Sequence, residues 1–125
     1  MSDPLKEALR VLDDYLAALN RGDEAGTNAA CNFPHVRLAA GKVVVWPNHG
    51  DYKLEDFRAR AGDGWHHSTW DERTPIHVGS AKVHLKVKFS RWRQDGSLIG
   101  SFETIYIVTD QDGHWGIQAR SSFAS

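Results

Sequence analysis

The sequence predicts a single α+β domain in which helices at the start of the chain pack on an antiparallel sheet. Three observations predict it: apolar residues recur every three or four positions over 4–20, residues 82–89 alternate strictly between apolar and polar, and glycine turns divide the last half into strands. A chain of 125 residues buries roughly two-thirds of its unfolded surface, enough for one core. We therefore expect one domain over residues 1–125.

Charge and composition exclude several classes of partner. Fifteen basic and sixteen acidic residues give a formal net charge of -1 without a basic block, so we expect no nucleic-acid partner. No apolar run approaches the roughly 20 residues of a membrane span, and the first residues lack a leader pattern, so we expect no membrane partner and a cytoplasmic location. Cys31 is the only cysteine, which excludes an internal disulfide and a cysteine-based zinc site.

The first half of the chain predicts three helices and a small hairpin. Asp3 and Pro4 form a helix start, and the apolar spacing then predicts a helix over 4–20. Asp23 can cap a short second helix through about Cys31. Residues 33–38 and 42–46 are typical of a short hairpin, and residues 54–61 suit a third helix that ends near Gly62 or Gly64.

The strands of the second half can be registered from their turns. A two-residue turn at Asp95–Gly96 makes the apolar faces of two strands coincide. It pairs Phe89 with Phe102, Val87 with Thr104 and Leu85 with Tyr106. Around the next turn, at 111–113, either available register places Trp115, Ile117 and Ala119 on the same inner face and Glu103, Gln118 and Arg120 on the outer face.

The strand expected over 68–78 leaves one alternative open. Simple alternation turns Trp70, Thr74, Ile76 and Val78 inward, and Glu72 with them. A bulge at Pro75 would turn Asp71 inward instead.

Two stretches carry a resemblance to a known fold family. Residues 14–23, at the end of the first helix, and residues 109–115, at the last turn, resemble the ketosteroid isomerase and SnoaL-like branch of the nuclear transport factor 2-like superfamily. Residues 33–37, 65–68 and 118–123 are similar to a bacterial subgroup without an assigned function. The resemblance implies a cystatin-like cone, with three N-terminal helices packed on a curved antiparallel sheet and a pocket between the first helix and the sheet.

The resemblance also implies roles for some positions and leaves others unfilled. Tyr15 lies where ketosteroid isomerases place the tyrosine that donates a hydrogen bond to the developing oxyanion. The general base would fall near Leu38 or Ala39, and neither can take a proton. The second oxyanion acid would fall at or beside Thr104, which is no carboxylic acid. Steroid isomerisation by the family mechanism is therefore disfavoured.

The residues that would line such a pocket form two groups. The candidates for proton transfer are Tyr15, His35, His67, and Asp71 or Glu72, and the candidates for ligand contact are Trp46, Trp70, Thr104 and Tyr106. No pair of histidines has helical ligand spacing, so we expect no metal, and no cofactor is implied.

These groups support two functions. The first is a cofactor-independent isomerase, cyclase or dehydratase that acts on a small hydrophobic molecule. The alternative is a non-catalytic ligand-binding or dimerisation module, because the acid and base of the family mechanism are missing. Ile105 and Ile107 share the outer face of the sheet, which favours a homodimer. A protein-interaction role like that of nuclear transport factor 2 itself ranks below both.

Overall fold

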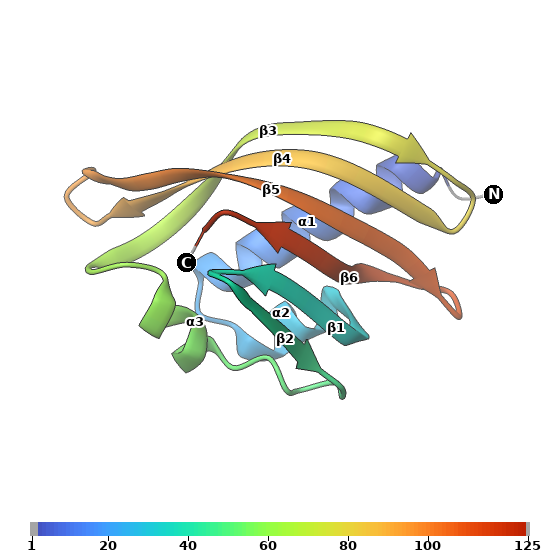
Figure 1. Cartoon of the computed structure of the whole chain (residues 1–125), viewed down its shortest axis with the longest axis horizontal. Helices are drawn as coiled ribbons and strands as arrows, with labels where there is room; N and C mark the ends of the chain where they lie inside the picture. Colours follow the sequence, from blue (N-terminus) through green and yellow to red (C-terminus); the bar gives the residue numbers. More distant parts are fainter. Residues whose placement is uncertain (1–2, 125) are drawn as a thin grey trace.

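A computed structural model describes residues 3–124 and has the predicted α+β architecture (Figure 1). The helices are α1 (Pro4–Asn20), α2 (Glu24–Ala29) and α3 (Leu54–Arg60). The strands are β1 (Cys31–Ala39), β2 (Lys42–Trp46), β3 (Trp65–Val78), β4 (Lys82–Arg93), β5 (Leu98–Gln111) and β6 (His114–Ser122). They form one sheet in the order β2-β1-β6-β5-β4-β3, and every neighbouring pair is antiparallel except β1 and β6, which run parallel.

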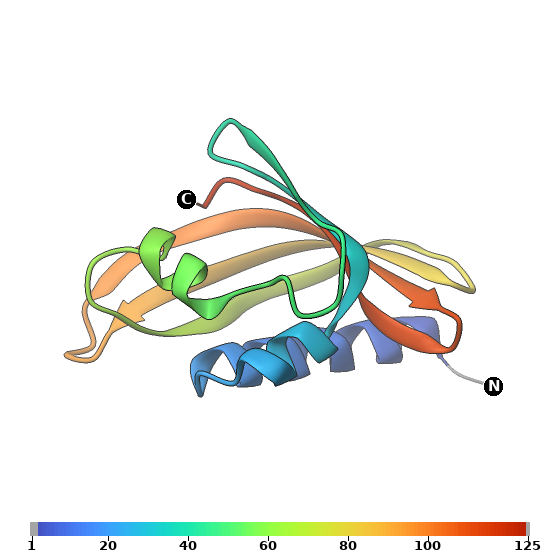
Figure 2. The same cartoon turned by 90° about the horizontal axis from the view of Figure 1, so that it is seen from below.

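The helix α1 lies along one face of the curved sheet, with α2 beside it and α3 near the end of the cone (Figure 2). Its start follows from Asp3, whose carboxylate accepts hydrogen bonds from the Leu5 and Lys6 amides, and from Pro4 in the first turn. Asp23 caps α2 through the Gly26 amide. This second helix ends at Ala29, before the predicted limit, because Cys31 already begins β1.

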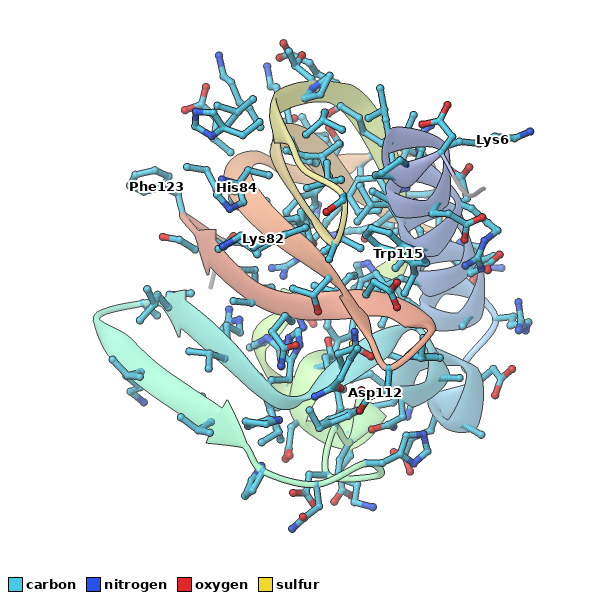
Figure 3. All side chains as sticks on the ribbon, turned by 90° about the vertical axis from the view of Figure 1, so that its right-hand side faces the viewer. Lys6, Lys82, His84, Asp112, Trp115 and Phe123 are labelled. Carbon is cyan, nitrogen blue, oxygen red and sulfur yellow. The ribbon has the colours of Figure 1, made fainter. Side chains whose placement is uncertain are left out.

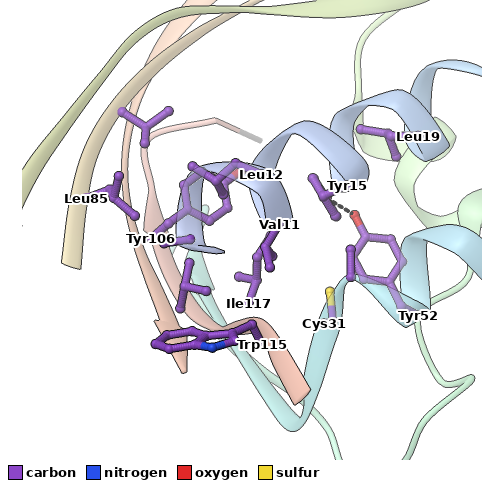
Figure 4. Close-up of a cluster of buried hydrophobic side chains, with 14 of the residues drawn as sticks. Val11, Leu12, Tyr15, Leu19, Cys31, Tyr52, Leu85, Tyr106, Trp115 and Ile117 are labelled. Atoms are coloured by element: carbon purple, nitrogen blue, oxygen red, sulfur yellow. Dashed lines mark hydrogen bonds between the residues drawn. The ribbon is translucent and has the colours of Figure 1, made fainter. Parts of the chain in front are cut away.

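The core fills the space between α1 and the inner sheet face (Figure 4). Val11 and Leu12 of α1 are almost fully buried, as are Leu85 and Ile117 of the sheet. Each such side chain contributes about 1.5–3 kcal/mol by leaving water. Figure 3 shows Trp115 between the sheet and α1, with Lys82 and His84 on the opposite side of the sheet. Within residues 3–124, no helix is long and apolar enough to cross a membrane.

The register of β4 and β5 is confirmed. Phe89 pairs with Phe102, Val87 with Thr104 and Leu85 with Tyr106. The inner face of β4 is buried at every second position from Val83 to Phe89. The predicted two-residue turn at Asp95–Gly96 is wrong, because the Arg93 amide donates to the Ser97 carbonyl and Trp92 pairs with Leu98. The extra residue Ile99 compensates for the longer loop, so the predicted register still holds from Arg91 to Lys82.

The prediction that Arg120 lies on the outer face is wrong. Val108 pairs with Ile117, but the next pair along the ladder joins Ile107 to Ala119, so Gln118 is an extra residue in β6. Such a bulge reverses the faces of the residues that follow it. Arg120 consequently pairs with Tyr106 and is buried, only 6% exposed.

The expectation that an acid of β3 turns inward is also wrong for both alternatives. The ladder between β3 and β4 is irregular at Asp71, between Trp70 and Glu72, and again between Pro75 and His77. After the first bulge, Glu72 pairs with Lys88 on the outer face, and both acids are exposed. The second irregularity lies in the exposed end of this edge strand, where Thr74, Ile76 and Val78, which were expected inside, are exposed as well.

Candidate functional site

A small cavity lies between α1, α3 and the inner face of the sheet. Its volume is about 30 Å³, room for about two water molecules or a group of similar size. Aromatic side chains line much of it, namely Tyr15, Phe57, Trp70, Phe89 and Tyr106. Four arginines complete the polar part of the lining: Arg37, Arg60, Arg91 and Arg120.

The four arginines come from four different elements. Arg37 lies on β1, Arg60 ends α3, Arg91 lies on β4 and Arg120 on β6. The described residues that line the cavity include no Asp or Glu. Among residues 3–124, none of the ion pairs to carboxylates involves Arg37, Arg60 or Arg120. The cavity therefore concentrates positive charge at the centre of the cone.

Arg120 is the most enclosed cation of this group after Arg91, and tyrosines surround it. Its Nη1 donates a hydrogen bond to the Tyr15 hydroxyl at 2.8 Å. Its guanidinium carbon lies 5.3 Å from the ring centres of both Tyr15 and Tyr52, and 6.0 Å from that of Tyr106. Burial lowers the pKa of Arg120, but the three tyrosines together hold it well above its usual value, so the residue stays charged.

The Arg120 guanidinium still has hydrogen-bonding capacity to spare. Its Nε and Nη2 atoms are buried and have no hydrogen-bond partner among the residues that the structure describes. The same holds for Nε of Arg60. Buried donors without a partner cost about 1–3 kcal/mol each, and more when the group is charged, so this arrangement calls for an acceptor.

Tyr15 and Tyr52 form a hydrogen-bonded pair beside the cavity (Figure 4). Their hydroxyl oxygens are 2.8 Å apart, and Arg60 Nη2 donates to the Tyr52 hydroxyl at 3.0 Å. Burial raises the pKa of Tyr15 well above its ordinary value. Burial also opposes ionisation of Tyr52, yet Arg120, Arg60 and the hydrogen bond from Tyr15 outweigh it and lower the pKa of Tyr52. Tyr15 is therefore the donor and Tyr52 the more acidic phenol.

Asn28 of α2 holds Tyr52 in this position. Its Nδ2 donates to the Tyr52 carbonyl at 2.9 Å, and its Oδ1 accepts from the Tyr52 amide at 3.2 Å. The same side chain also bonds to the Glu24 carbonyl and the Gly50 amide. One buried amide thus fixes the segment that leads into α3.

Mutual repulsion between the arginines is visible at Arg37. Burial, followed by the charges of Arg60 and Arg120, lowers the pKa of Arg37 to about 10. The pKa of Arg91 is lowered in the same way, by burial and then by Arg60. At a pKa of about 10, Arg37 remains protonated at neutral pH, and its proximity to Arg60 and Arg120 destabilises the folded chain.

A wider groove adjoins the cavity on the side of the β1–β2 hairpin. It has a volume of about 330 Å³ and lies between the inner face of the hairpin and α3. Arg37 and Arg60 line both the groove and the cavity, so the two spaces meet at these side chains. Val44 and Trp46 form its apolar wall, and Trp46 stacks on Tyr52 with ring centres 5.2 Å apart.

Four of the candidate residues lie at these two spaces. Tyr15, Trp70 and Tyr106 line the cavity, and Trp46 lines the groove. Thr104 is on the inner face and buried, but its hydroxyl is 2.7 Å from that of Ser122, which lines the cavity in its place.

The remaining candidates are not brought together. His35 is buried beside Trp46, where its Nδ1 donates to the Ile117 carbonyl at 2.7 Å. Burial, together with the charge of Arg120, lowers the pKa of His35 to about 3, so it is neutral. His67 stacks on Trp92, away from the cavity lining. Asp71 accepts a hydrogen bond from Ser90, and Glu72 accepts one from Thr74.

Sequence reasoning missed the arginines and Tyr52. Arg91 carried a signal, because it continues the alternation that places Val83 and Phe89 inside. Arg37 also follows His35 by two positions on the same strand. The bulge at Gln118 concealed Arg120, and Tyr52 lies in a turn-rich segment whose sequence has no period.

Comparison with known structures supports the architecture. The chain is similar to an NTF2-like protein of unknown function from Shewanella oneidensis (TM-score 0.71, 16% identity, 97% of this chain and 99% of that one). It is similar to a candidate ketosteroid isomerase from Shewanella frigidimarina (TM-score 0.73, 17% identity, 93% of this chain and 94% of that one). A structure from Catenulispora acidiphila in complex with S-DNPA is similar too (TM-score 0.74, 13% identity, 96% of this chain and 92% of that one). Identities this low show a shared fold.

A comparison of sequences alone gives a more specific result. No curated protein matches the chain. A family model described as NTF2-like protein (DUF6841) matches residues 6–122, which is nearly all of the sequence. The chain therefore belongs to this NTF2-like family.

Proposed function

We propose that this protein binds a small, largely hydrophobic molecule in the cone between α1 and the inner face of the sheet. The observation that carries the proposal is the cavity lined by Tyr15, Trp70 and Tyr106, which adjoins the groove beside Trp46. Aromatic walls with a few polar groups at one end are typical of small-molecule sites. The complex of the Catenulispora acidiphila neighbour with S-DNPA supports ligand binding on this fold.

Binding can be tested with a neutral aromatic probe. We expect 1-naphthol, added to the isotope-labelled protein, to shift amide resonances around the groove, on the inner face of β1 and β2 and in α3. Trp46→Leu should weaken the binding, since Trp46 lines the groove. Trp92→Leu is the matched control, because Trp92 lies on the outer face and donates to Thr69. Shifts confined to the outer face, or the absence of shifts, would contradict the proposal.

A second function is favoured by the Tyr15–Tyr52 pair. A cofactor-independent isomerase, cyclase or dehydratase needs a donor for an oxyanion and a group that moves a proton. Arg120 supplies the donors through its Nε and Nη2 atoms, and the Tyr15–Tyr52 pair, in which Tyr52 is the more acidic phenol, moves the proton. In this second function, the proton moves through the Tyr15–Tyr52 pair, and His35 takes no part.

Proton exchange from a simple ketone separates the second function from the first. We expect the protein to accelerate exchange of the protons next to the carbonyl of 2-tetralone in deuterated water. The acceleration should disappear in Tyr15→Phe and in Tyr52→Phe, and it should persist in His35→Asn. A protein that binds 1-naphthol without any effect on this exchange is a binding protein only.

A further inference from the structure

We propose that the ligand of this pocket is an organic carboxylate, whose charged group lies among Arg37, Arg60 and Arg120 and whose body lies in the groove against Trp46. The inference rests on the proposed function and specifies its ligand class. It follows from three properties of the site: the positive charge of Arg37, Arg60 and Arg120, which no Asp or Glu among residues 3–124 pairs with; the donors of Arg60 and Arg120 that lack a partner among the same residues; and the different sizes of the two spaces.

The first property is charge. Arg120 is buried, with only 6% of its surface exposed. No Asp or Glu among residues 3–124 forms an ion pair with Arg37, Arg60 or Arg120. Buried charges in proteins are normally paired, because an isolated one loses far more in hydration than packing returns. In the groove, Arg37, Lys42 and Arg60 outnumber the single acid, Asp56. A bound anion would compensate this excess.

The second property is the set of free donors. The tyrosine rings around Arg120 stabilise its charge through their faces, but a ring face does not satisfy N–H groups that point along the guanidinium plane. Nε and Nη2 of Arg120 and Nε of Arg60 have no acceptor among the described residues. A carboxylate accepts several such bonds, and its flat shape matches the planar fork of arginine.

The third property is size. The cavity of about 30 Å³ accommodates a group of two or three non-hydrogen atoms and excludes an aromatic ring. The groove of about 330 Å³ accommodates a ring or a short chain, and Val44 and Trp46 give it an apolar wall. Since Arg37 and Arg60 border both spaces, a molecule with a carboxylate at one end and an apolar body can occupy them together.

The test compares an acid with its uncharged isostere. Titration calorimetry with 1-naphthaleneacetate and 1-naphthaleneacetamide keeps the ring and changes only the head group. We expect the acid to bind about tenfold tighter than the amide, because hydrogen bonds to a charged group are worth more than neutral ones. Arg60→Gln should lower the affinity for the acid about tenfold and leave the amide almost unchanged.

The control uses the same helix and the same change of charge. Arg58 is exposed on α3, outside both the cavity and the groove. Arg58→Gln should leave both affinities nearly unchanged, so an equal loss in the two variants would mean nonspecific attraction and would overturn the inference. Tighter binding of 1-naphthyl phosphate than of the acid would also overturn it, in favour of a phosphate.

The outcomes also separate this inference from the proposed function. Equal affinity for acid and amide would leave the hydrophobic pocket in place and overturn the carboxylate. If neither compound binds at millimolar concentration but 1-naphthol shifts the inner face, the carboxylate is again overturned and the pocket retained. If 1-naphthol fails as well, both are wrong.

Discussion

Arg120 on β6 donates a hydrogen bond to the hydroxyl of Tyr15 on α1 at 2.8 Å, which joins the sheet to the central helix at the middle of the cone. The bond exists because the extra residue Gln118 turns Arg120 inward. It links a buried phenol to a permanent positive charge. Tyrosine and arginine thus supply the titratable groups among the described residues of the cavity lining, and the carboxylates of β3 lie outside it.

The first prediction concerns the titration of the three tyrosines in the chain. Burial opposes ionisation of Tyr52, but Arg120, Arg60 and the bond from Tyr15 lower its pKa below the usual 10.0, while burial raises the pKa values of Tyr15 and Tyr106. Near-ultraviolet difference absorbance should therefore show one of the three ionising below pH 10.0 and two above it.

Variants identify which of the three tyrosines ionises first. Tyr52→Phe should remove it, and Arg60→Gln should move it upward because a neighbouring charge is lost. Tyr106→Phe is the control and should retain it. Three tyrosines that ionise together, or an early step that survives Tyr52→Phe, would count against the proposed hydrogen-bond polarity.

The second prediction concerns acid stability. Burial, followed by Arg120, lowers the pKa of His35 from 6.5 to about 3, so the unfolded chain binds a proton there that the folded chain does not. Stability from this group is complete above pH 6.5 and is lost as pH falls toward 3. At about pH 5 the loss is about 2 kcal/mol.

The variant His35→Asn separates this effect from general acid denaturation. Its side-chain amide can still donate to the Ile117 carbonyl in place of Nδ1, but it does not titrate. Urea unfolding as a function of pH should show a flatter profile between neutral pH and pH 5 than the wild type, by about 2 kcal/mol. His66→Asn, at an exposed site, should keep the wild-type slope; equal slopes in all three proteins would refute the assignment.

The fold could be predicted from the sequence where local chemistry and periodicity agree. The capping carboxylate of Asp3 and the apolar face of α1 define that helix, and the apolar alternation of β4 defines which of its faces is buried. Bulges interrupt this reasoning, because one extra residue such as Gln118 or Asp71 leaves no mark on composition yet reverses every following side chain.

The site was less predictable than the fold for a second reason. Tyr15, Trp70 and Tyr106 could be placed because they lie on regular elements whose inner faces the pattern defines. The arginine cluster brings together residues from positions 37, 60 and 120, and like charges that converge in space have no local sequence pattern. Only the tertiary structure shows that they share one cavity.

The third prediction tests how Tyr52 is positioned. Asn28→Ala removes four hydrogen bonds and leaves the Tyr52 amide and carbonyl without these partners. The free energy of unfolding should fall by roughly 3 kcal/mol, measured with urea. The early tyrosine ionisation should also disappear at pH values where the variant is still folded, because Tyr52 no longer holds its place beside Arg60.

Asn48→Ala is the matched control for Asn28. Asn48 is exposed and lies in the same connection between β2 and α3. Its replacement should change the free energy of unfolding by less than about 0.5 kcal/mol and should not affect the tyrosine titration. A similar loss of stability in both variants would mean that Asn28 has no special role.

The fourth prediction is that Arg37 binds ligand at the expense of stability. Because burial and the charges of Arg60 and Arg120 lower its pKa from 12.5 to about 10, the repulsion is fully present below pH 10 and is relieved as pH rises through that value. Arg37→Met removes the charge and keeps most of the packing volume. Because Arg37 also borders the open groove, solvent screening reduces the expected gain in the free energy of unfolding to about 1 kcal/mol.

The same variant should lose affinity for 1-naphthaleneacetate, and the carboxylate should stabilise the wild-type protein more than the variant, because a ligand stabilises only the state that it binds. Urea unfolding with and without the compound measures both effects. Arg58→Met, exposed on α3, should change neither. If Arg37→Met instead lowers the stability while the acid protects both proteins equally, then Arg37 serves the fold and not the ligand, and the carboxylate group has to be placed elsewhere in the cone.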